Sequence, residues 1–450
     1  MHSNRIFSRW WPALVVLAVL AVNLQAGEKG DESDEGKRAQ GLGPDGLPKY
    51  RHPYPDGLYS TVTAMNTFGI PEDAPKLKKL KLKVPGFKKE MPVHMIMQDY
   101  VAPLVVVLMG VDGKVDGPWG DLFPYWYSAA GYHVLTFDGT FTAQYPQICG
   151  QGVVGNFDAE TDQVAAVVDA FLKTPEIAKK VNKVGVIGMS FGATQALLLA
   201  AKAKAGKLPF ALAGCLALSP PVRLKTAARI VDRFFVEDRW DTTMIELAEK
   251  FMPHRPVAEG QRIPFKPTEM RAAIGFAFRD GLTEVVERND RAYKLKILPS
   301  EESGDNRGTW AEATGFERFI EAYTFPYWQK KGTVKSAEEL WDMADLVKIL
   351  PRLPAYAEAV VAANDPFTTA EDLAAAKAVD AGKNLIVLPN GGHLGFIAAD
   401  WTLVKALRMF KEKQPQPEGL DRGDLDRARK DVLDAAKEGN KEIAPNDPKK

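Results

Sequence analysis

The chain has 450 residues, of which 46% are hydrophobic, and its 58 Lys and Arg balance its 58 Asp and Glu. A chain of this length and composition can bury a large core. Because the net charge is zero, there is no excess of basic residues for nucleic acid, and we expect no nucleic-acid partner. Cys149 and Cys215 are too few for a disulfide framework and lack metal-ligand spacing. They could form one bridge in an oxidising compartment, but the apolar predicted strand around Cys215 favours a buried thiol.

The N-terminus has the pattern of a signal peptide. Arg5 and Arg9 precede an apolar segment, residues 10–22, which is shorter than the roughly 20 residues that span a bilayer. Ala26 is a small residue before the predicted cleavage point. We therefore expect residues 1–26 to be removed and the mature protein to be periplasmic or secreted, without stable membrane insertion. The alternative is a chain that the uncleaved segment anchors in the membrane.

Residues 27–57 are predicted to form a flexible linker, because Gly, Asp, Glu and Lys dominate residues 27–47. The first part of a globular core is assigned to residues 58–220. Its first predicted elements are a strand pair at residues 79–84 and 91–98, a strand at 104–108, a helix near 121–130, a strand at 133–137 and a helix at 158–172. In the last of these, Val164, Val167, Val168 and Phe171 recur at a helical period, which indicates a helix that covers one face of a sheet.

A G-x-G-x-x-G pattern, formed by Gly150, Gly152 and Gly155, stands before that helix. A dinucleotide-binding fingerprint requires its first glycine immediately after a strand. This pattern begins well after the predicted strand that ends at residue 137. We therefore interpret it as an ordinary glycine-rich loop and expect no nucleotide cofactor.

The next element pair contains the most informative motif. Residues 184–187 predict a strand, residues 193–203 predict a helix, and a G-x-S-x-G motif with Ser190 at its centre lies between them. In this context the motif is typical of a nucleophile elbow, where a sharp turn holds the serine in strained backbone geometry. A predicted strand at residues 211–218 continues the alternation, which predicts a mostly parallel sheet with helices on both faces.

A serine hydroxyl is a weak nucleophile at neutral pH, so it requires a histidine that accepts its proton and a carboxylate that orients the histidine. Of the six histidines, only His393 lies in a glycine turn after a late predicted strand, residues 384–389. Asp365 follows the predicted strand at residues 357–363. The order Ser190, Asp365, His393 is that of α/β-hydrolases. The alternatives are an Asn-Asp-Pro turn and a glycine loop without a catalytic role.

Two stretches downstream of Ser190, residues 364–367 (Asn-Asp-Pro-Phe) and 391–396 (Gly-Gly-His-Leu-Gly-Phe), resemble the YheT-like branch of the α/β-hydrolases. The resemblance covers roughly residues 95–412. It implies an α/β-hydrolase fold and a Ser190, Asp365 and His393 triad. Two positions depart from the branch, since Asn364 replaces the first residue of Asp-Asp-Pro-Phe and Met109 replaces the histidine of a His-Gly pair.

The segment of residues 221–353 interrupts the alternation of strands and helices. It contains predicted helices at residues 224–235 and 242–251 and many aromatic residues. The resemblance implies that this segment is a mainly helical cap inserted over the serine. Residues 354–412 then complete the core with a predicted last helix at 394–411. Residues 413–450 form a charged tail in which Leu425, Ala428, Val432 and Ala435 are spaced for one amphipathic helix.

An oxyanion hole requires two NH donors directed at the substrate carbonyl oxygen. One should be the NH of Phe191, at a helix N-terminus. The other should come from the loop after the strand at residues 104–108, where we favour Val111 over Gly110. The alternative is that residues 110–117 form only a flexible turn.

These residues predict an exported serine hydrolase that cleaves a small-molecule carboxylic ester through an acyl-enzyme, with no metal and no organic cofactor. A serine peptidase with the same triad is one alternative, because ester and amide hydrolysis begin with the same attack. A non-catalytic cell-envelope binding protein on the same fold is another, because a fold alone does not establish activity.

Overall fold

The computed structural model describes residues 47, 49–52, 54–64, 75–117, 120–237, 264–297, 314–380 and 384–410. The predicted signal peptide, the predicted helix at 242–251 and the charged tail lie outside the described residues. In the part of the chain that the structure describes, no helix is long and apolar enough to cross a membrane.

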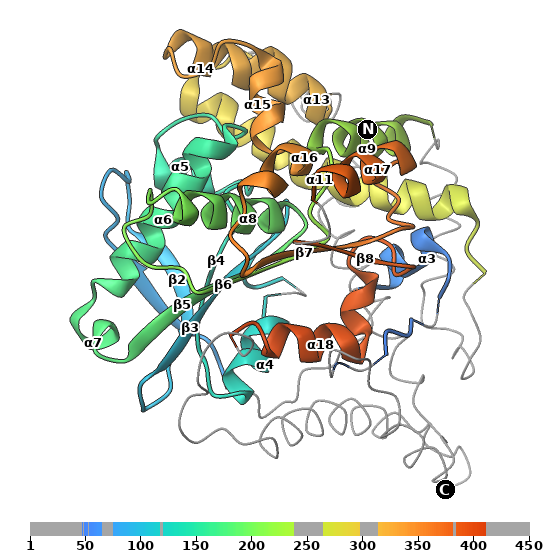
Figure 1. Ribbon diagram of the computed structural model, residues 1–450. Coiled ribbons are helices and arrows are strands. Elements are labelled where there is room, and N and C mark those ends of the chain that lie inside the picture. The colour runs from blue at the N-terminus through green and yellow to red at the C-terminus, as the bar shows by residue number, and fades with distance from the viewer. Residues whose placement is uncertain are drawn as a thin grey trace, which may run out of the picture.

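Eight strands form one sheet in the order β1-β2-β4-β3-β5-β6-β7-β8 (Figure 1). Only β1 with β2 and β2 with β4 pair antiparallel, and all other neighbours are parallel. The strands are β1 (Lys78–Leu82), β2 (Met91–Ile96), β3 (Ala102–Leu108), β4 (His133–Phe137), β5 (Val181–Met189), β6 (Gly214–Leu218), β7 (Ala357–Ala362) and β8 (Leu385–Leu388). The predicted mostly parallel sheet is confirmed.

Helices cover both faces of this sheet (Figure 1). On one face lie α4 (Leu122–Ala129) and α18 (Asp400–Leu407), and on the other lie α6 (Phe157–Leu172) and α8 (Phe191–Lys204). The remaining elements outside the region between β6 and β7 are α3 (Gly57–Thr63), α5 (Tyr145–Cys149), α7 (Pro175–Ala178), α17 (Ala370–Asp380) and the 3-10 helix η6 (Gly395–Ala398).

Strand β3 shows why both faces are covered. All of its residues are buried. Leu104, Val106 and Leu108 belong to the core beside α6 and α8, whereas Val105 and Val107 belong to the core beside α4 and α18. Since successive strand side chains point to opposite faces, a continuous apolar strand requires a helical layer on each side.

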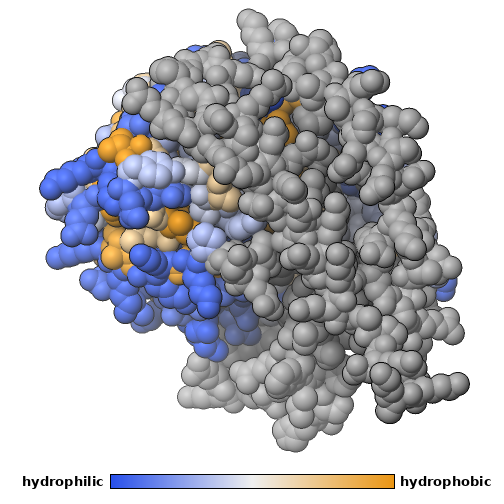
Figure 2. All heavy atoms as spheres, turned by 90° about the horizontal axis from the view of Figure 1, so that it is seen from below, coloured by the Kyte–Doolittle hydropathy of each residue, from blue (hydrophilic) through white to orange (hydrophobic). Residues whose placement is uncertain are grey.

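The exposed edge of the sheet is formed by β1, whose Lys78, Lys79 and Lys81 are exposed. Charged side chains on an edge strand oppose pairing with another chain. Seen from below, the coloured part of the surface in Figure 2 is mostly hydrophilic, with hydrophobic side chains between the hydrophilic ones.

Every described element between β6 and β7 is helical. These elements are α9 (Leu224–Glu237), α11 (Pro267–Tyr293), α13 (Phe316–Phe319), the π-helix η4 (Ile320–Thr324), α14 (Phe325–Lys330), α15 (Ala337–Met343), α16 (Leu346–Ile349) and the 3-10 helix η5 (Leu350–Arg352). In Figure 1, α13, α14 and α15 lie beyond α6 and α8, on the same side of the sheet. We refer to the elements from α9 to α15 as the helical insertion.

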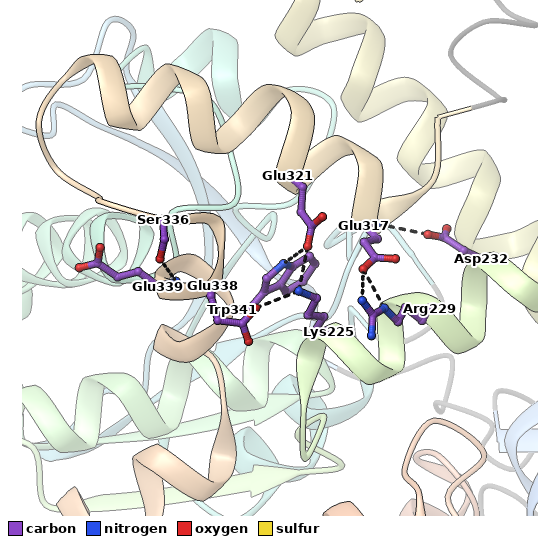
Figure 3. Close-up of polar contacts among 9 residues, drawn as sticks. All are labelled: Lys225, Arg229, Asp232, Glu317, Glu321, Ser336, Glu338, Glu339 and Trp341. Atoms are coloured by element: carbon purple, nitrogen blue, oxygen red, sulfur yellow. Dashed lines mark hydrogen bonds and ion pairs between the residues drawn. The ribbon is translucent and has the colours of Figure 1, made fainter.

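Polar contacts hold the helical insertion together (Figure 3). Lys225 of α9 pairs with Glu321 of η4 at 2.9 Å, and Arg229 of α9 donates to Glu317 of α13 at 2.7 Å. Asp232 accepts the backbone NH of Glu317 at 3.2 Å. Exposed ion pairs each contribute little to stability, so we expect these contacts mainly to fix the relative placement of α9 and α13.

Two predicted boundaries differ from the structure. The predicted helix at residues 394–411 is divided, because Ala399 has extended backbone (φ −79°, ψ 136°) and separates η6 from α18. Part of the predicted linker at residues 27–57 is packed, since Leu47 is only 3% exposed and the hydroxyl of Tyr50 donates to the carbonyl of Asn390 at 2.7 Å. These contacts join distant parts of the chain, and local composition does not reveal them.

The two cysteines, Cys149 and Cys215, are both free and buried, so they do not pair with each other. Burial raises the pKa of the Cys149 thiol to about 11 and raises that of Cys215 further. Both groups are therefore neutral at physiological pH and pack as small apolar side chains.

Candidate functional site

The G-x-S-x-G motif forms the sharp turn between β5 and α8. Ser190 has φ 53° and ψ −119°, a strained conformation for a residue with a Cβ. Its backbone NH donates to the carbonyl of Leu218 in β6 at 2.8 Å. A Cβ at Gly188 would collide with the Gly192 carbonyl, and one at Gly192 would collide with the carbonyls at the end of β3. The glycines thus permit the close backbone approach that holds the turn.

The three predicted site residues, which follow β5, β7 and β8, meet at the carboxyl end of the sheet. The hydroxyl of Ser190 lies 2.9 Å from Nε2 of His393, and Nδ1 of His393 lies 2.8 Å from Oδ2 of Asp365. All three side chains are buried, with exposed fractions of 8%, 5% and 4%. The chain separates Ser190 and His393 by 203 positions, so the fold and not local sequence brings them together.

Asp365 is held in place by its own turn. Its Oδ1 accepts the backbone NH of Phe367 at 2.9 Å, while Oδ2 faces the histidine. The ring of Phe367 packs edge-to-face against the imidazole of His393, with centroids 4.6 Å apart. Because Oδ1 already accepts the NH of Phe367, Oδ2 is the oxygen placed to accept Nδ1–H in the tautomer of His393 that leaves Nε2 free.

The loop after β3 lies beside the serine. A Cβ at Gly110 would be 3.2 Å from the Cβ of Ser190. Within the described residues, neither the NH of Val111 nor that of Phe191 donates a hydrogen bond. These two NH groups, one on the loop beside Ser190 and one on the residue that follows it, are candidate donors for an oxyanion site.

The shape of this loop depends on backbone hydrogen bonds. The NH of Gly113 donates to the carbonyl of Gly110 at 3.0 Å, and the NH of Asp112 donates to the carbonyl of Phe141 at 3.0 Å. The side chain of Met109 is 3% exposed and belongs to the core beside α4 and α18. Backbone hydrogen bonds therefore form this turn.

A buried carboxyl group that the sequence reading missed supports the same region. Glu160 accepts a hydrogen bond from the hydroxyl of Thr140 at 2.6 Å and another from the NH of Gly155. Gln195 of α8 donates to that Thr140 hydroxyl at 2.6 Å. Burial is the main cause that raises the pKa of Glu160 to about 7. Glu160 stands four residues before Val164, so a carboxylate on the apolar face of α6 was the available signal.

The N-terminal segment also reaches the site, which the sequence reading did not anticipate. The hydroxyl of Thr61 in α3 accepts the backbone NH of His393 at 2.8 Å. His52 lies 3.1 Å from the carbonyl of Gly395 through Nε2. No hydrophobic period or motif in residues 49–64 marks these contacts.

Aromatic rings connect the serine to the helical insertion. Consecutive ring centroids lie 4.6–6.4 Å apart in the series Phe191, Phe141, Phe316, Phe278, Phe367 and His393. The insertion contributes Phe278 and Phe316, and the core contributes the others. The surroundings of the serine and the histidine are therefore strongly apolar.

The glycine-rich loop at residues 150–155 contacts the helical insertion. The indole NH of Trp328 donates to the carbonyl of Val153 at 2.8 Å, and the hydroxyl of Thr324 donates to the carbonyl of Val154 at 2.8 Å. The loop precedes α6 and does not directly follow a strand, as the sequence reading expected. It joins the core to η4 and α14.

Comparison with protein families decides the superfamily. Residues 117–404 match the alpha/beta hydrolase family. The chain belongs to the α/β hydrolase family. Among curated proteins, none matches the hydrolase chain by sequence.

Solved structures that resemble this hydrolase include enzymes of several kinds. An esterase of Pyrococcus furiosus is 12% identical with a TM-score of 0.41, covering 75% of this chain and 92% of its own. Est1E from Butyrivibrio proteoclasticus is 14% identical with a TM-score of 0.36, covering 74% and 96%. The acylaminoacyl peptidase of Pyrococcus horikoshii is 9% identical with a TM-score of 0.40, covering 79% and 44%. Identities and TM-scores this low do not indicate a shared substrate.

Proposed function

We propose that this α/β hydrolase is a serine hydrolase that cleaves carboxylic esters through an acyl-enzyme. The observation that carries the proposal is the unbroken series of hydrogen bonds from Ser190 through His393 to Asp365, at a strained turn beside two unpaired NH groups. We also propose that the enzyme belongs to the YheT-like branch, whose motifs supply the same three residues.

The first step transfers the hydroxyl proton of Ser190 to Nε2 of His393 as the serine oxygen attacks the ester carbonyl. Asp365 accepts the Nδ1–H, which leaves Nε2 free to accept that proton and stabilises the imidazolium that forms. His393 then returns the proton to the departing alcohol. Water, activated by the same histidine, releases the acid from the acyl-enzyme.

The negative charge on the carbonyl oxygen needs donors that are fixed before the reaction. The NH groups of Val111 and Phe191 are available for this role. Each such donor typically lowers the barrier by about 3 to 4 kcal/mol. The Phe191 donor also lies at the N-terminus of α8, where the helix dipole favours negative charge.

The surroundings of the serine favour an apolar acyl group. The aromatic series from Phe191 to His393 includes Phe278 and Phe316 of the helical insertion. Apolar rings next to the nucleophile would stabilise a bound hydrocarbon chain and reduce the access of water. Chain-length preference should therefore depend on these two phenylalanines.

Hydrolysis of a short and a long p-nitrophenyl ester tests the proposal, with Ser190→Ala and His393→Ala beside the wild type. We expect each variant to lower kcat/KM on the order of 10⁴-fold or more while its circular dichroism spectrum stays unchanged. A fluorophosphonate should label the wild type at Ser190 and leave Ser190→Ala unlabelled. A folded wild type that neither hydrolyses either ester nor reacts with the fluorophosphonate would contradict the proposal and favour the binding-protein alternative.

A further inference from the structure

The loops that carry Asp365 and His393 are both tied to the N-terminal segment, residues 54–64. The hydroxyl of Thr61 accepts the NH of His393 at 2.8 Å and donates to the carbonyl of Gly57 at 2.7 Å. The threonine therefore joins the backbone of the histidine directly to the body of α3. This contact spans 332 positions of the chain.

Asn364, the neighbour of Asp365, makes a second link. Its Nδ2 donates to the carbonyl of Pro55 at 2.7 Å, and its Oδ1 accepts the NH of Gly392 at 2.9 Å. One amide side chain thus connects the acid loop, the histidine loop and the N-terminal segment. An aspartate could accept from Gly392 but could not donate to Pro55.

The backbones at this junction touch. A Cβ at Gly57 would collide with the carbonyl of Asn364. The loop that precedes His393 has positive φ at both Gly391 and Gly392, values of 122° and 56°. Glycines at such positions restrict the chain little, so the loop depends on outside contacts to keep one conformation.

We propose that Thr61 and Asn364 are positioning residues for His393 and Asp365, so that the N-terminal segment forms part of the support of the site. This inference rests on the proposed function. Thr61 acts through the main chain of His393, and Asn364 acts through the two loops, without contact to the substrate. Losing either link should let the imidazole shift from the serine hydroxyl, and small shifts of a catalytic group strongly reduce the rate.

The decisive experiment compares two variants. Thr61→Val keeps the shape of the side chain but removes its hydroxyl, whereas Thr61→Ser keeps the hydroxyl. Both are made in the full chain. We expect Thr61→Val to lower kcat between roughly 10-fold and 100-fold with little change in KM, and Thr61→Ser to retain most of the wild-type kcat. Fluorophosphonate labelling should slow in parallel, because it reports the activated serine independently of substrate binding.

Thr283→Val is the matched control. The hydroxyl of Thr283 donates to the carbonyl of Arg279 at 2.8 Å, four residues earlier in α11, just as that of Thr61 donates to Gly57. We expect this variant to keep the wild-type kcat. An equal loss of kcat in Thr283→Val would overturn the inference, because the effect would then come from any lost threonine bond within a helix.

Asn364→Asp provides a second route in case Thr61→Val does not fold. It has nearly the same volume and should also lower kcat with little change in KM, because it loses the bond to Pro55. Wild-type kcat in folded Thr61→Val and Asn364→Asp would overturn the positioning role while the proposed function stands. A wild type that is inactive and unlabelled would instead overturn the proposed function, and this inference with it.

Discussion

The two halves of the site are held in different ways. The serine half consists of Ser190, its flanking strand and helix, and the loop after β3. Its shape follows from the close approach of Gly188 and Gly192 to neighbouring backbone. The histidine half consists of the loops that carry Asp365 and His393, and it is held by Thr61 and Asn364 through contacts with the N-terminal segment.

This difference shows what a motif can encode. A strained turn between a strand and a helix can be specified by five consecutive residues, because sterics at the glycines leave one arrangement. The loop that carries His393 takes its position largely from residues elsewhere in the chain, among them Thr61 and Asn364. The serine half should therefore fail by steric collision within its own turn, and the histidine half by disturbance of its contacts with the N-terminal segment, which are hydrogen bonds and the close approach of Gly57 to Asn364.

The largest expected effect is on the serine half. In Gly192→Ala, the new methyl group would collide with the carbonyls of Leu108 and Met109, and backbone cannot move as a flexible side chain can. We expect the free energy of unfolding to fall by about 3 kcal/mol or more, together with loss of hydrolysis. Urea unfolding followed by circular dichroism measures the first quantity.

Gly206→Ala is the control for that variant. Gly206 has φ 68° and no atom near its Cβ position, so alanine there meets only backbone strain. We expect a cost of roughly 1 kcal/mol from the left-handed conformation alone. If both variants lose a similar free energy of unfolding, the close approach of Gly192 to neighbouring backbone does not contribute to its cost.

The next expected effect is on stability and concerns Glu160, the buried carboxyl group that is linked through Thr140 to Gln195 of α8. The pKa of Glu160 is raised by burial from 4.5 to about 7, so the folded state holds this proton where the unfolded state has lost it. Stability from this group is therefore complete below pH 4.5 and is lost as pH rises through 7. Relative to Glu160→Gln, the free energy of unfolding of the wild type should fall by up to about 3 kcal/mol across this range.

Comparing the wild type with Glu160→Gln at each pH cancels the contribution of the other titrating groups to stability, because both proteins contain these groups. In Glu160→Gln, the changed hydrogen bonds to Thr140 and Gly155 alter the free energy of unfolding by an amount that does not depend on pH. Thermal unfolding curves at pH 5, 7 and 8.5 are sufficient. A constant difference between wild type and variant over these three values would show that Glu160 does not titrate there.

Sequence reasoning predicted the serine half better than the histidine half for the same physical reason. The strand, turn and helix around Ser190 have periodicity and a motif, and the observed β5 and α8 enclose the predicted ranges. The family match supports the α/β-hydrolase fold. Chain order and loop context predict Asp365 and His393, and the two side chains lie within hydrogen-bond distance of each other.

What could not be predicted depends on contacts between remote positions. In the sequence, Asn364 stands out only because it differs from the Asp-Asp-Pro-Phe pattern that residues 364–367 resemble, yet its amide links two loops to Pro55. The composition of residues 27–47 predicts a flexible linker over residues 27–57, yet residues 50 and 52 contact the loop and the 3-10 helix after β8. Nothing local distinguishes a polar segment that packs against the rest of the fold from one that does not.

The histidine half can be disturbed without touching a hydrogen-bonding side chain. In Gly57→Ala, the methyl group would collide with the carbonyl of Asn364 and push α3 away from both loops. Alanine favours helices over glycine by about 1 kcal/mol, so α3 itself should gain stability. We therefore expect kcat for ester hydrolysis to fall roughly 10-fold. Steady-state kinetics beside Gly206→Ala measures this, and unchanged kcat would mean that the approach of α3 does not position the loops.

The smallest expected effect distinguishes side chain from backbone in the loop after β3. Met109 is buried in the core beside α4 and α18, and backbone bonds of Gly113 and Asp112 close the turn. Met109→Leu preserves volume and apolar character, so it should cost less than about 1.5 kcal/mol of stability. Its kcat for p-nitrophenyl esters should match the wild type, because Val111 and Phe191 present their NH groups through the main chain. A large loss of kcat with normal stability would show that the Met109 side chain shapes the oxyanion site, and that the serine half also depends on a specific side chain.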